Sequence, residues 1–199
     1  MSEIAGDAAA TGAAVERRGR VYVALVHYPV KGRDGSVITT SVTNLDVHDI
    51  ARTARTYDIA GYFVVTPIEA QRTLVEHILG YWRDGGGAKR VPERSDALSR
   101  AKPIASLEEV YAELGGDPLV LTTAARANLP STSYEAARAR IAAEAPRPAL
   151  VVFGTGYGLT DGVLSKAHVH LAPVRPGGYN HLPVRCAVAI ILDRLLGDG

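Results

Sequence analysis

The sequence predicts an α/β fold in which a mainly parallel sheet is sandwiched by helices. Short apolar runs alternate with helical patterns from residue 19 onward. Runs such as residues 21–26 lack polar alternation, as expected for strands that are covered on both faces. Helix-start signals lie between the runs. This order is typical of a parallel sheet with ligand-binding loops at the carboxyl ends of its strands.

Length and composition limit the classes of protein that fit. At 199 residues, with 47% hydrophobic and 22% charged residues, the chain is most simply one domain with a proper core. The net charge of +1 means that any contact with nucleic acid must come from a local basic patch. A single cysteine excludes an internal disulfide and fits the cytoplasm. We expect neither a signal peptide nor a membrane span, because no apolar run reaches membrane-spanning length and no basic segment precedes an apolar one at the start. We expect residues 1–18 to form a disordered tail and residues 19–199 to form the domain.

The first half of the domain predicts two strands and two helices. Thr43 or Asn44 can cap the first helix. The second helix is expected to begin at Thr66, because Pro67 suits a first turn and Glu69 completes a capping box with Thr66. In chain order, the expected elements are a strand at 21–26, a helix at 43–57, a strand at 61–65 and a helix at 66–82.

Residues 83–102 show weak periodicity and contain the triple glycine Gly85-Gly86-Gly87. We expect an exposed, mobile, basic loop here. Its charged residues are Arg83, Lys89, Arg90, Arg94, Arg100 and Lys102, against Asp84, Glu93 and Asp96.

The second half predicts further strands and helices in alternation. Ser106 and Glu109 form a capping box, and Ser133 lies at the start of a later helix. The expected elements are a short strand at 104, a helix from 106 to 115, a strand at 119–123, a helix at 132–144, strands at 149–153 and 168–172, and an apolar helix ending at 196.

A glycine loop, Gly154-Thr155-Gly156-Tyr157-Gly158-Leu159, follows the strand at 149–153. Alternating glycines let the backbone bend sharply and approach a ligand closely. The loop lacks the G-x-G-x-x-G spacing of a dinucleotide site and the Gly-Lys-Ser/Thr of a Walker loop. Taken alone, it fits either a pocket built from main-chain groups or a flexible connection.

Three segments, in the right order, resemble the motifs of the SPOUT superfamily of RNA methyltransferases. The first runs from Asn44 to Ile50-Ala51-Arg52-Thr53-Ala54. The second is the strand and glycine loop at 152–159. The third is the strand at 169–174, with 182–184 opening the apolar helix. The resemblance covers most of residues 20–199.

The resemblance implies a carboxyl-terminal trefoil knot that holds S-adenosylmethionine, a homodimer with each site near the interface, and a structured RNA substrate, either tRNA or rRNA. The wide apolar surface of the last helix agrees with a dimer, although burial within one subunit also explains it. Backbone-rich segments are expected to bind the cofactor through Thr122, Thr123, Ala124, Gly154, Thr155, Gly156, Gly158, Leu159, Leu171, Pro173, Tyr179, Asn180, Leu182 and Val184.

The sequence departs from the ribose-methylating pattern of the family at four positions. Asp58 replaces a glycine, and Tyr157 replaces an acidic residue. Pro183 and Arg185 replace an asparagine and a serine. The target atom is therefore left open, and base methylation is allowed.

Three residues are candidates for catalysis. Arg52 matches the reactive arginine of the family, although it also fits a solvated helix position. Methyl transfer needs positioning and the removal of one proton. His181 is suited to remove that proton near pH 7, or it packs beside Pro183. Asn180 either orients a ligand or holds a turn.

The remaining candidates concern RNA, metal and packing. His168 and His170 share one face of a strand, but no third ligand is placed by the sequence, so we expect stacking or hydrogen bonding and no metal. Tyr157 and Tyr179 suit base stacking or packing, and Cys186 is expected to be a buried small side chain. The residues expected to bind RNA are Arg52, Arg55, Lys89, Arg90 and Arg94.

Two alternatives stay open. One is a non-catalytic protein of the same fold that binds S-adenosylmethionine and RNA. The other is a hydrolase or nucleotide-binding enzyme of ordinary doubly wound topology, for which the sequence offers no nucleophile or phosphate-binding lysine at a strand end. Lys166 is the nearest candidate and has the wrong spacing.

Overall fold

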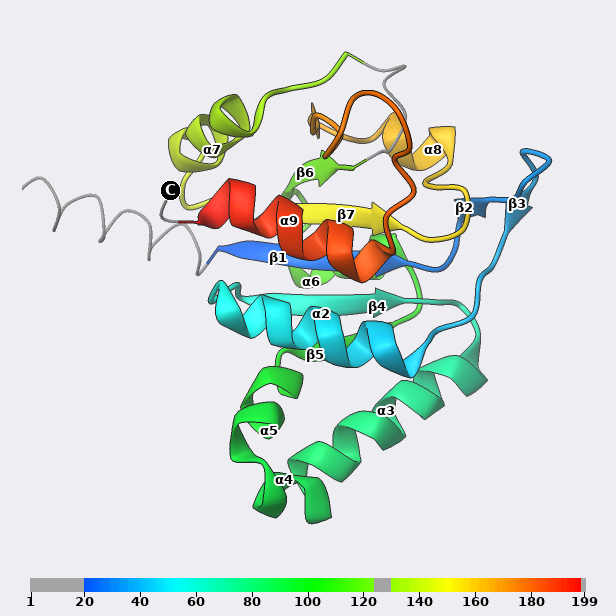
Figure 1. The fold of residues 1–199 in the computed structure, drawn as a ribbon, viewed down its shortest axis with the longest axis vertical. Helices are drawn as coiled ribbons and strands as arrows, with labels where there is room; N and C mark the ends of the chain where they lie inside the picture. Colours follow the sequence, from blue (N-terminus) through cyan, green and yellow to red (C-terminus); the bar gives the residue numbers. More distant parts are fainter. Residues whose placement is uncertain (1–19, 124–129, 198–199) are drawn as a thin grey trace, which may run out of the picture.

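A computed structural model describes residues 20–123 and 130–197. It confirms the α/β class. Six parallel strands form one sheet (Figure 1). In spatial order they are β5 (Ala101–Ile104), β4 (Gly61–Val65), β1 (Val21–Val26), β7 (Ala149–Gly154), β6 (Leu119–Thr122) and β8 (Val169–His170). A small antiparallel hairpin, β2 (Val30–Lys31) and β3 (Val37–Ile38), follows β1.

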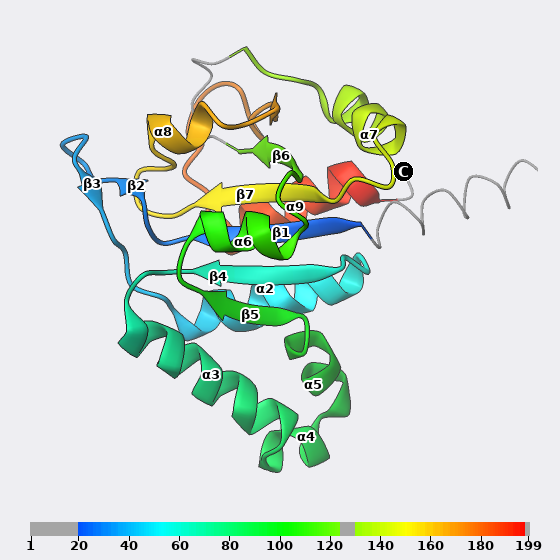
Figure 2. The ribbon, with the colours of Figure 1, turned by 180° about the vertical axis from the view of Figure 1, so that it is seen from behind.

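Helices cover both faces of the sheet. One face carries α2 (Asn44–Thr56), α7 (Tyr134–Ala143) and α9 (Val184–Leu196), as Figure 1 shows. The opposite face carries α6 (Leu107–Glu113) and α8 (Asp161–Leu164), seen from behind in Figure 2. At the β5 end of the sheet lie α3 (Glu69–Arg83), α4 (Gly86–Arg90) and α5 (Pro92–Leu98).

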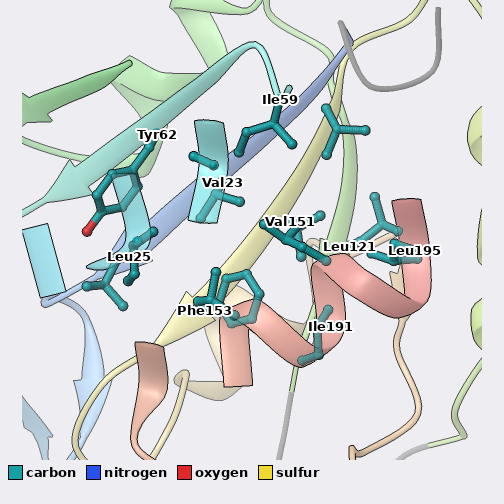
Figure 3. Close-up of a cluster of buried hydrophobic side chains, with 14 of the residues drawn as sticks. Val23, Leu25, Ile59, Tyr62, Leu121, Val151, Phe153, Ile191 and Leu195 are labelled. Atoms are coloured by element: carbon teal, nitrogen blue, oxygen red, sulfur yellow. The ribbon is translucent and has the colours of Figure 1, made fainter. Parts of the chain in front are cut away.

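The core consists of two layers, one on each face. Because successive strand side chains point to opposite faces, Val23 and Leu25 of β1 enter one layer and Ala24 and Val26 enter the other. All four are fully buried, as the unbroken apolar run predicts. Figure 3 shows the first layer, where Phe153 of β7 lies close to α9.

The prediction of a mobile loop at 83–102 is wrong. Two short helices, α4 and α5, and the start of β5 occupy it. Ala97 and Leu98 are buried, and Gly87 packs against the rings of Tyr81 and Trp82. Tertiary burial therefore orders a segment whose own helical pattern is weak.

The predicted start of the second helix is also wrong. α3 begins at Glu69, with Ile68 as its cap residue and no side-chain cap bond. Thr66 is fully buried, and its hydroxyl accepts a long hydrogen bond from the Ile68 N–H at 3.4 Å. Thr66 thus holds the turn before the helix. The caps expected at Thr43 and Ser106 are confirmed.

Cys186 is exposed rather than buried, because it lies on a side of α9 that residues 20–123 and 130–197 do not cover. The expected tail at residues 1–18 lies wholly outside the described residues, and so does Ala124. None of the helices in the described part of the chain is both long and apolar enough to span a membrane.

Candidate functional site

The glycine loop follows the carboxyl end of β7. One side of the loop is packed and the other is open. Gly156 and Gly158 have φ angles of 58° and 101°, the left-handed region that favours glycine. A Cβ on Gly156 would lie 3.1 Å from the Lys31 carbonyl oxygen, so this side is filled by the hairpin. A Cβ on Gly158 would meet nothing within 4 Å. Backbone at Gly158 is therefore open to close approach by a ligand.

Hydrogen bonds fix the loop to its neighbours. The Lys31 N–H donates to the Gly158 carbonyl at 2.8 Å, and the Tyr157 N–H donates to the Lys31 carbonyl at 3.0 Å. The Thr155 hydroxyl donates to the Val26 carbonyl at 3.0 Å. The loop is therefore a hydrogen-bonded segment of defined shape, which argues against a flexible connection.

The carboxyl ends of β6 and β8 lie beside the glycine loop, because β7, β6 and β8 are parallel neighbours. The Leu171 N–H donates to the Thr122 carbonyl at 2.9 Å, and the Thr123 N–H donates to the Val152 carbonyl at 3.2 Å. The Thr122 hydroxyl lies 2.8 Å from Nδ1 of His170. The three predicted cofactor segments thus meet at one edge of the sheet, which we call the cofactor edge.

A fourth segment, residues 173–183, arches from β8 to the start of α9 (Figure 1). It carries Tyr179, Leu182 and His181, which are all exposed, and Asn180, which is half-buried. The Tyr179 and His181 rings pack edge to face, with centroids 5.2 Å apart. An exposed imidazole in this segment is open to a substrate, as a proton acceptor requires.

His27 is a residue that sequence reasoning missed. It follows β1 and is buried at the base of the glycine loop, with Nδ1 3.0 Å from the Thr40 hydroxyl. Its Nε2 is buried without a hydrogen-bond partner in the described part of the chain. Burial lowers the pKa of His27 to about 4, although the Asp46 carboxylate opposes this shift. A histidine directly after a buried strand was the available signal.

Arg185 ties the start of α9 to α2. Its Nε lies 3.3 Å from Asp49, and its guanidinium lies 3.9 Å from Asp46. Asp46 also accepts a hydrogen bond from the Thr43 hydroxyl at 2.6 Å. Arg185 therefore anchors the start of α9, where the arching segment ends.

His168 and His170 both bond to the neighbouring strand, as one of the two expected uses requires. Nδ1 of His168 accepts the Val120 N–H at 3.0 Å, and His170 contacts Thr122. Within residues 20–123 and 130–197, neither belongs to a cluster of three or more metal-ligating side chains.

A groove of about 650 Å³ lies between α2, α3 and α5. Arg52 and Arg94 line it together with Trp82 and His48. The Arg94 guanidinium lies 5.0 Å from the centre of the Trp82 ring. The pKa of His48 is lowered, first by burial and then by the charge of Arg94. The groove is distinct from the cofactor edge, since its lining includes no residue of the glycine loop, of the ends of β6 and β8 or of the arching segment.

The residues predicted to bind RNA separate into three groups. Arg52 and Arg94 share the groove. Lys89 and Arg90 are exposed on α4. Arg55 is engaged by two carboxylates: Asp58, and Asp96 at 2.5 Å.

The fold defines a class: a parallel α/β domain, in which ligand-binding loops typically lie at the carboxyl ends of neighbouring strands. Residues 20–197 match the model of the family described as SAM-dependent RNA methyltransferase. The chain therefore belongs to this family of S-adenosylmethionine-dependent RNA methyltransferases, which excludes the hydrolase alternative.

The chain is similar in sequence to one relative and in structure to two solved proteins. It is 43% identical over 189 residues to a protein of Oleidesulfovibrio alaskensis named tRNA (guanine-N(1)-)-methyltransferase, and the match covers 92% of this chain and 44% of the relative. The chain thus spans less than half the length of that relative. A probable methyltransferase from Bordetella pertussis superposes with a TM-score of 0.63 at 18% identity, covering 92% and 96% of the two chains. The Aquifex aeolicus TrmH/SpoU tRNA modifying enzyme gives 0.55 at 12%, covering 97% and 83%. These likenesses confirm the SPOUT-type fold, while the knot itself stays a prediction.

Proposed function

We propose that this chain transfers a methyl group from S-adenosylmethionine to a base of tRNA, with guanine N1 as the first target to test. The cofactor edge carries this proposal, because open backbone at Gly158 lies beside the ends of β6 and β8. The name of the relative from Oleidesulfovibrio alaskensis supports a tRNA guanine. The loss of the family's ribose-methylating residues at Pro183 and Arg185 supports a base.

The residues fit an adenosyl ligand held by main-chain groups. In this proposal the backbone at 122–124, 154–159 and 171–173 holds the cofactor, and Tyr179, Asn180, Leu182 and Val184 close the site. The bound cofactor supplies a methyl group activated on a sulfonium sulfur. The residues of this chain would position the target nitrogen against that methyl group and would take up the proton that the nitrogen loses on transfer.

His181 is the base in this proposal, since its imidazole is exposed in the arching segment. Asn180 orients the target or the methionine carboxylate. Arg52 is placed on α2 outside the cofactor edge of its own subunit. It would serve RNA or the site of a second subunit.

A homodimer is part of the proposal. Leu182, just before α9, is 43% exposed. Cys186 is exposed on α9. These neighbouring exposed side chains at the start of α9 support a contact with a second copy, because exposed apolar side chains that lie together mark interaction sites.

The test is calorimetric titration of the purified chain with S-adenosylmethionine, followed by transfer of labelled methyl to tRNA. Gly156→Val should abolish binding, because Gly156 has a positive φ and a Cβ there would press on Lys31. Gly162→Val on α8 is the matched control, since a Cβ there meets nothing within 4 Å.

Three outcomes separate the candidates. Binding with transfer supports the proposal. Binding without transfer to any tRNA or rRNA favours the non-catalytic alternative, for which the replaced motif residues are the supporting observation. Absence of binding, with and without RNA, overturns both.

A further inference from the structure

We propose that the groove between α2, α3 and α5 is a second RNA subsite, which takes one unpaired nucleotide of the substrate away from the cofactor edge. This inference rests on the proposed RNA substrate and adds the structural class of RNA that is recognised. Such a subsite differs from a general basic surface, because it binds only RNA that offers an unstacked base.

The size of the groove suits a single nucleotide. Its volume of about 650 Å³ lies within the range of roughly 300–1,000 Å³ typical of small-ligand sites. A double helix presents its bases stacked and paired, so a groove of this size can admit a base only from a loop, a bulge or a strand end.

The Trp82 ring, which lines the groove, is held in place by the residues packed around it. A Cβ on Gly87 would lie 2.7 Å from Cε3 of Trp82, so α4 packs tightly against that ring. The rings of His48 and Tyr81 meet Trp82 edge to face, at centroid distances of 5.6 and 5.3 Å. Arg94 lies over the Trp82 ring. Tyr81, at 50% exposed, and the guanidinium of Arg94 are therefore the planar groups that a base can stack on.

The charges of the groove are left uncompensated. Neighbouring arginines have acidic partners: Arg55 pairs with Asp96, and Arg83 pairs with Asp84. In contrast, Arg52 and Arg94 form no ion pair with any residue in the described ranges.

The one carboxylate lining the groove, that of Asp49, is already engaged by Arg185. Arg52 and Arg94 thus have no ion-pair partner in the described ranges and lie beside groups on which a base can stack. This combination suits binding of the phosphate and the base of one nucleotide.

The same features argue against a second copy of this chain as the occupant. Buried centres of protein–protein contacts are depleted of unpaired charge. Arg52 and Arg94 would each need a carboxylate from the partner, whereas RNA supplies phosphates at every nucleotide.

The test uses Trp82, which is the single tryptophan of the sequence, so fluorescence excited selectively from tryptophan reports on this groove. The full chain, with S-adenosylmethionine bound, is titrated with a single-stranded RNA oligonucleotide, with its duplex, and with an abasic strand of equal length. The single strand should change the fluorescence and bind about fivefold or more tighter than the other two, the low end of what one stacked base contributes.

Two variants and one control locate the effect. Tyr81→Leu and Arg94→Gln should each weaken single-strand binding by about fivefold or more and leave the affinity for S-adenosylmethionine unchanged. Arg138→Gln on α7 removes one positive charge on a separate helix and should have little effect.

Equal affinity for all three RNAs, or unaltered binding by both variants, overturns the subsite and leaves the proposed function standing. Sedimentation gives a second check: if Tyr81→Leu dissociates a dimer, the groove is an interface between copies and the inference is wrong. Loss of cofactor binding by the wild-type chain would instead overturn the proposed function.

Discussion

The hydroxyl groups of Thr40 and Thr155 lie 2.5 Å apart, joining the segment after β3 to the glycine loop. Thr155 donates its proton to the Val26 carbonyl, so Thr40 must be the donor to Thr155. Thr40 is then left to accept from Nδ1–H of His27, 3.0 Å away. This chain of bonds fixes His27 as the neutral Nδ1–H tautomer, with Nε2 bare, because a proton on Nε2 would find no acceptor among the described residues.

Thr155→Val should weaken S-adenosylmethionine binding, because valine keeps the shape of the side chain but removes both hydroxyl bonds that hold the loop. We expect the Kd to rise about fivefold, corresponding to about 1 kcal/mol for a hydrogen bond. Calorimetry measures this change. Thr73→Val at an exposed position of α3 is the matched control. An unchanged Kd for Thr155→Val would show that the bonds to Thr40 and Val26 do not shape the site.

His27 should make the fold sensitive to acid. Burial lowers its pKa in the folded protein to about 4, from an ordinary value of 6.5. The unfolded chain therefore binds a proton first as the pH falls. The free energy of unfolding is therefore unaffected by titration of His27 above about pH 6.5. It falls as the pH drops towards 4, by up to roughly 3 kcal/mol.

The measurement is the free energy of unfolding in urea across this pH range. His27→Gln should show a shallower slope than the wild type, because the titrating group is gone. Some slope will remain, since the pKa of His48 is lowered as well. His181→Gln, at an exposed position, should follow the wild type. If the free energy of unfolding of His27→Gln depended on pH as steeply as that of the wild type, His27 would not be the source of the acid sensitivity.

Arg185→Gln should loosen the contact between α9 and α2. The Arg185 side chain is 34% exposed, so solvent screens its pairs with Asp49 and Asp46. We expect a loss of about 1 kcal/mol or less in the free energy of unfolding. A double-mutant cycle with Asp49→Asn isolates the pair, and Arg33→Gln in an exposed turn serves as control. Strict additivity of the two changes would mean that the ion pair contributes nothing.

Leu195→Ala should destabilise the domain by about 2–5 kcal/mol, because Leu195 is fully buried in the layer that joins α9 to the sheet (Figure 3). Thermal and urea unfolding measure the loss. Leu74→Ala on α3 removes the same atoms from a side chain that is 49% exposed, so its effect should be much smaller. Similar losses for both variants would contradict the assignment of α9 to the core.

Much of the architecture could be read from local patterns. The apolar run at 21–26 and the cap at Thr43 predicted β1 and α2, because strand burial and helix capping depend on residues adjacent in the sequence. The same reasoning failed at 83–102, where α5 packs against α2, as the ion pair between Asp96 and Arg55, 41 positions apart, shows. It also failed at Cys186, because the sequence does not tell which side of α9 the chain covers.

The sequence by itself determined the fold class, the segments of the cofactor edge and the likeness to RNA methyltransferases, since each depends on residue types at short spacing. Only the tertiary structure brought Thr40 and His27 under the glycine loop and placed Arg52 beside Arg94 and Trp82. Those contacts join residues 13 to 115 positions apart, as the pairs His27–Thr40 and Thr40–Thr155 show. They form only when strands and helices pack, and no local pattern encodes which distant side chains that packing brings together.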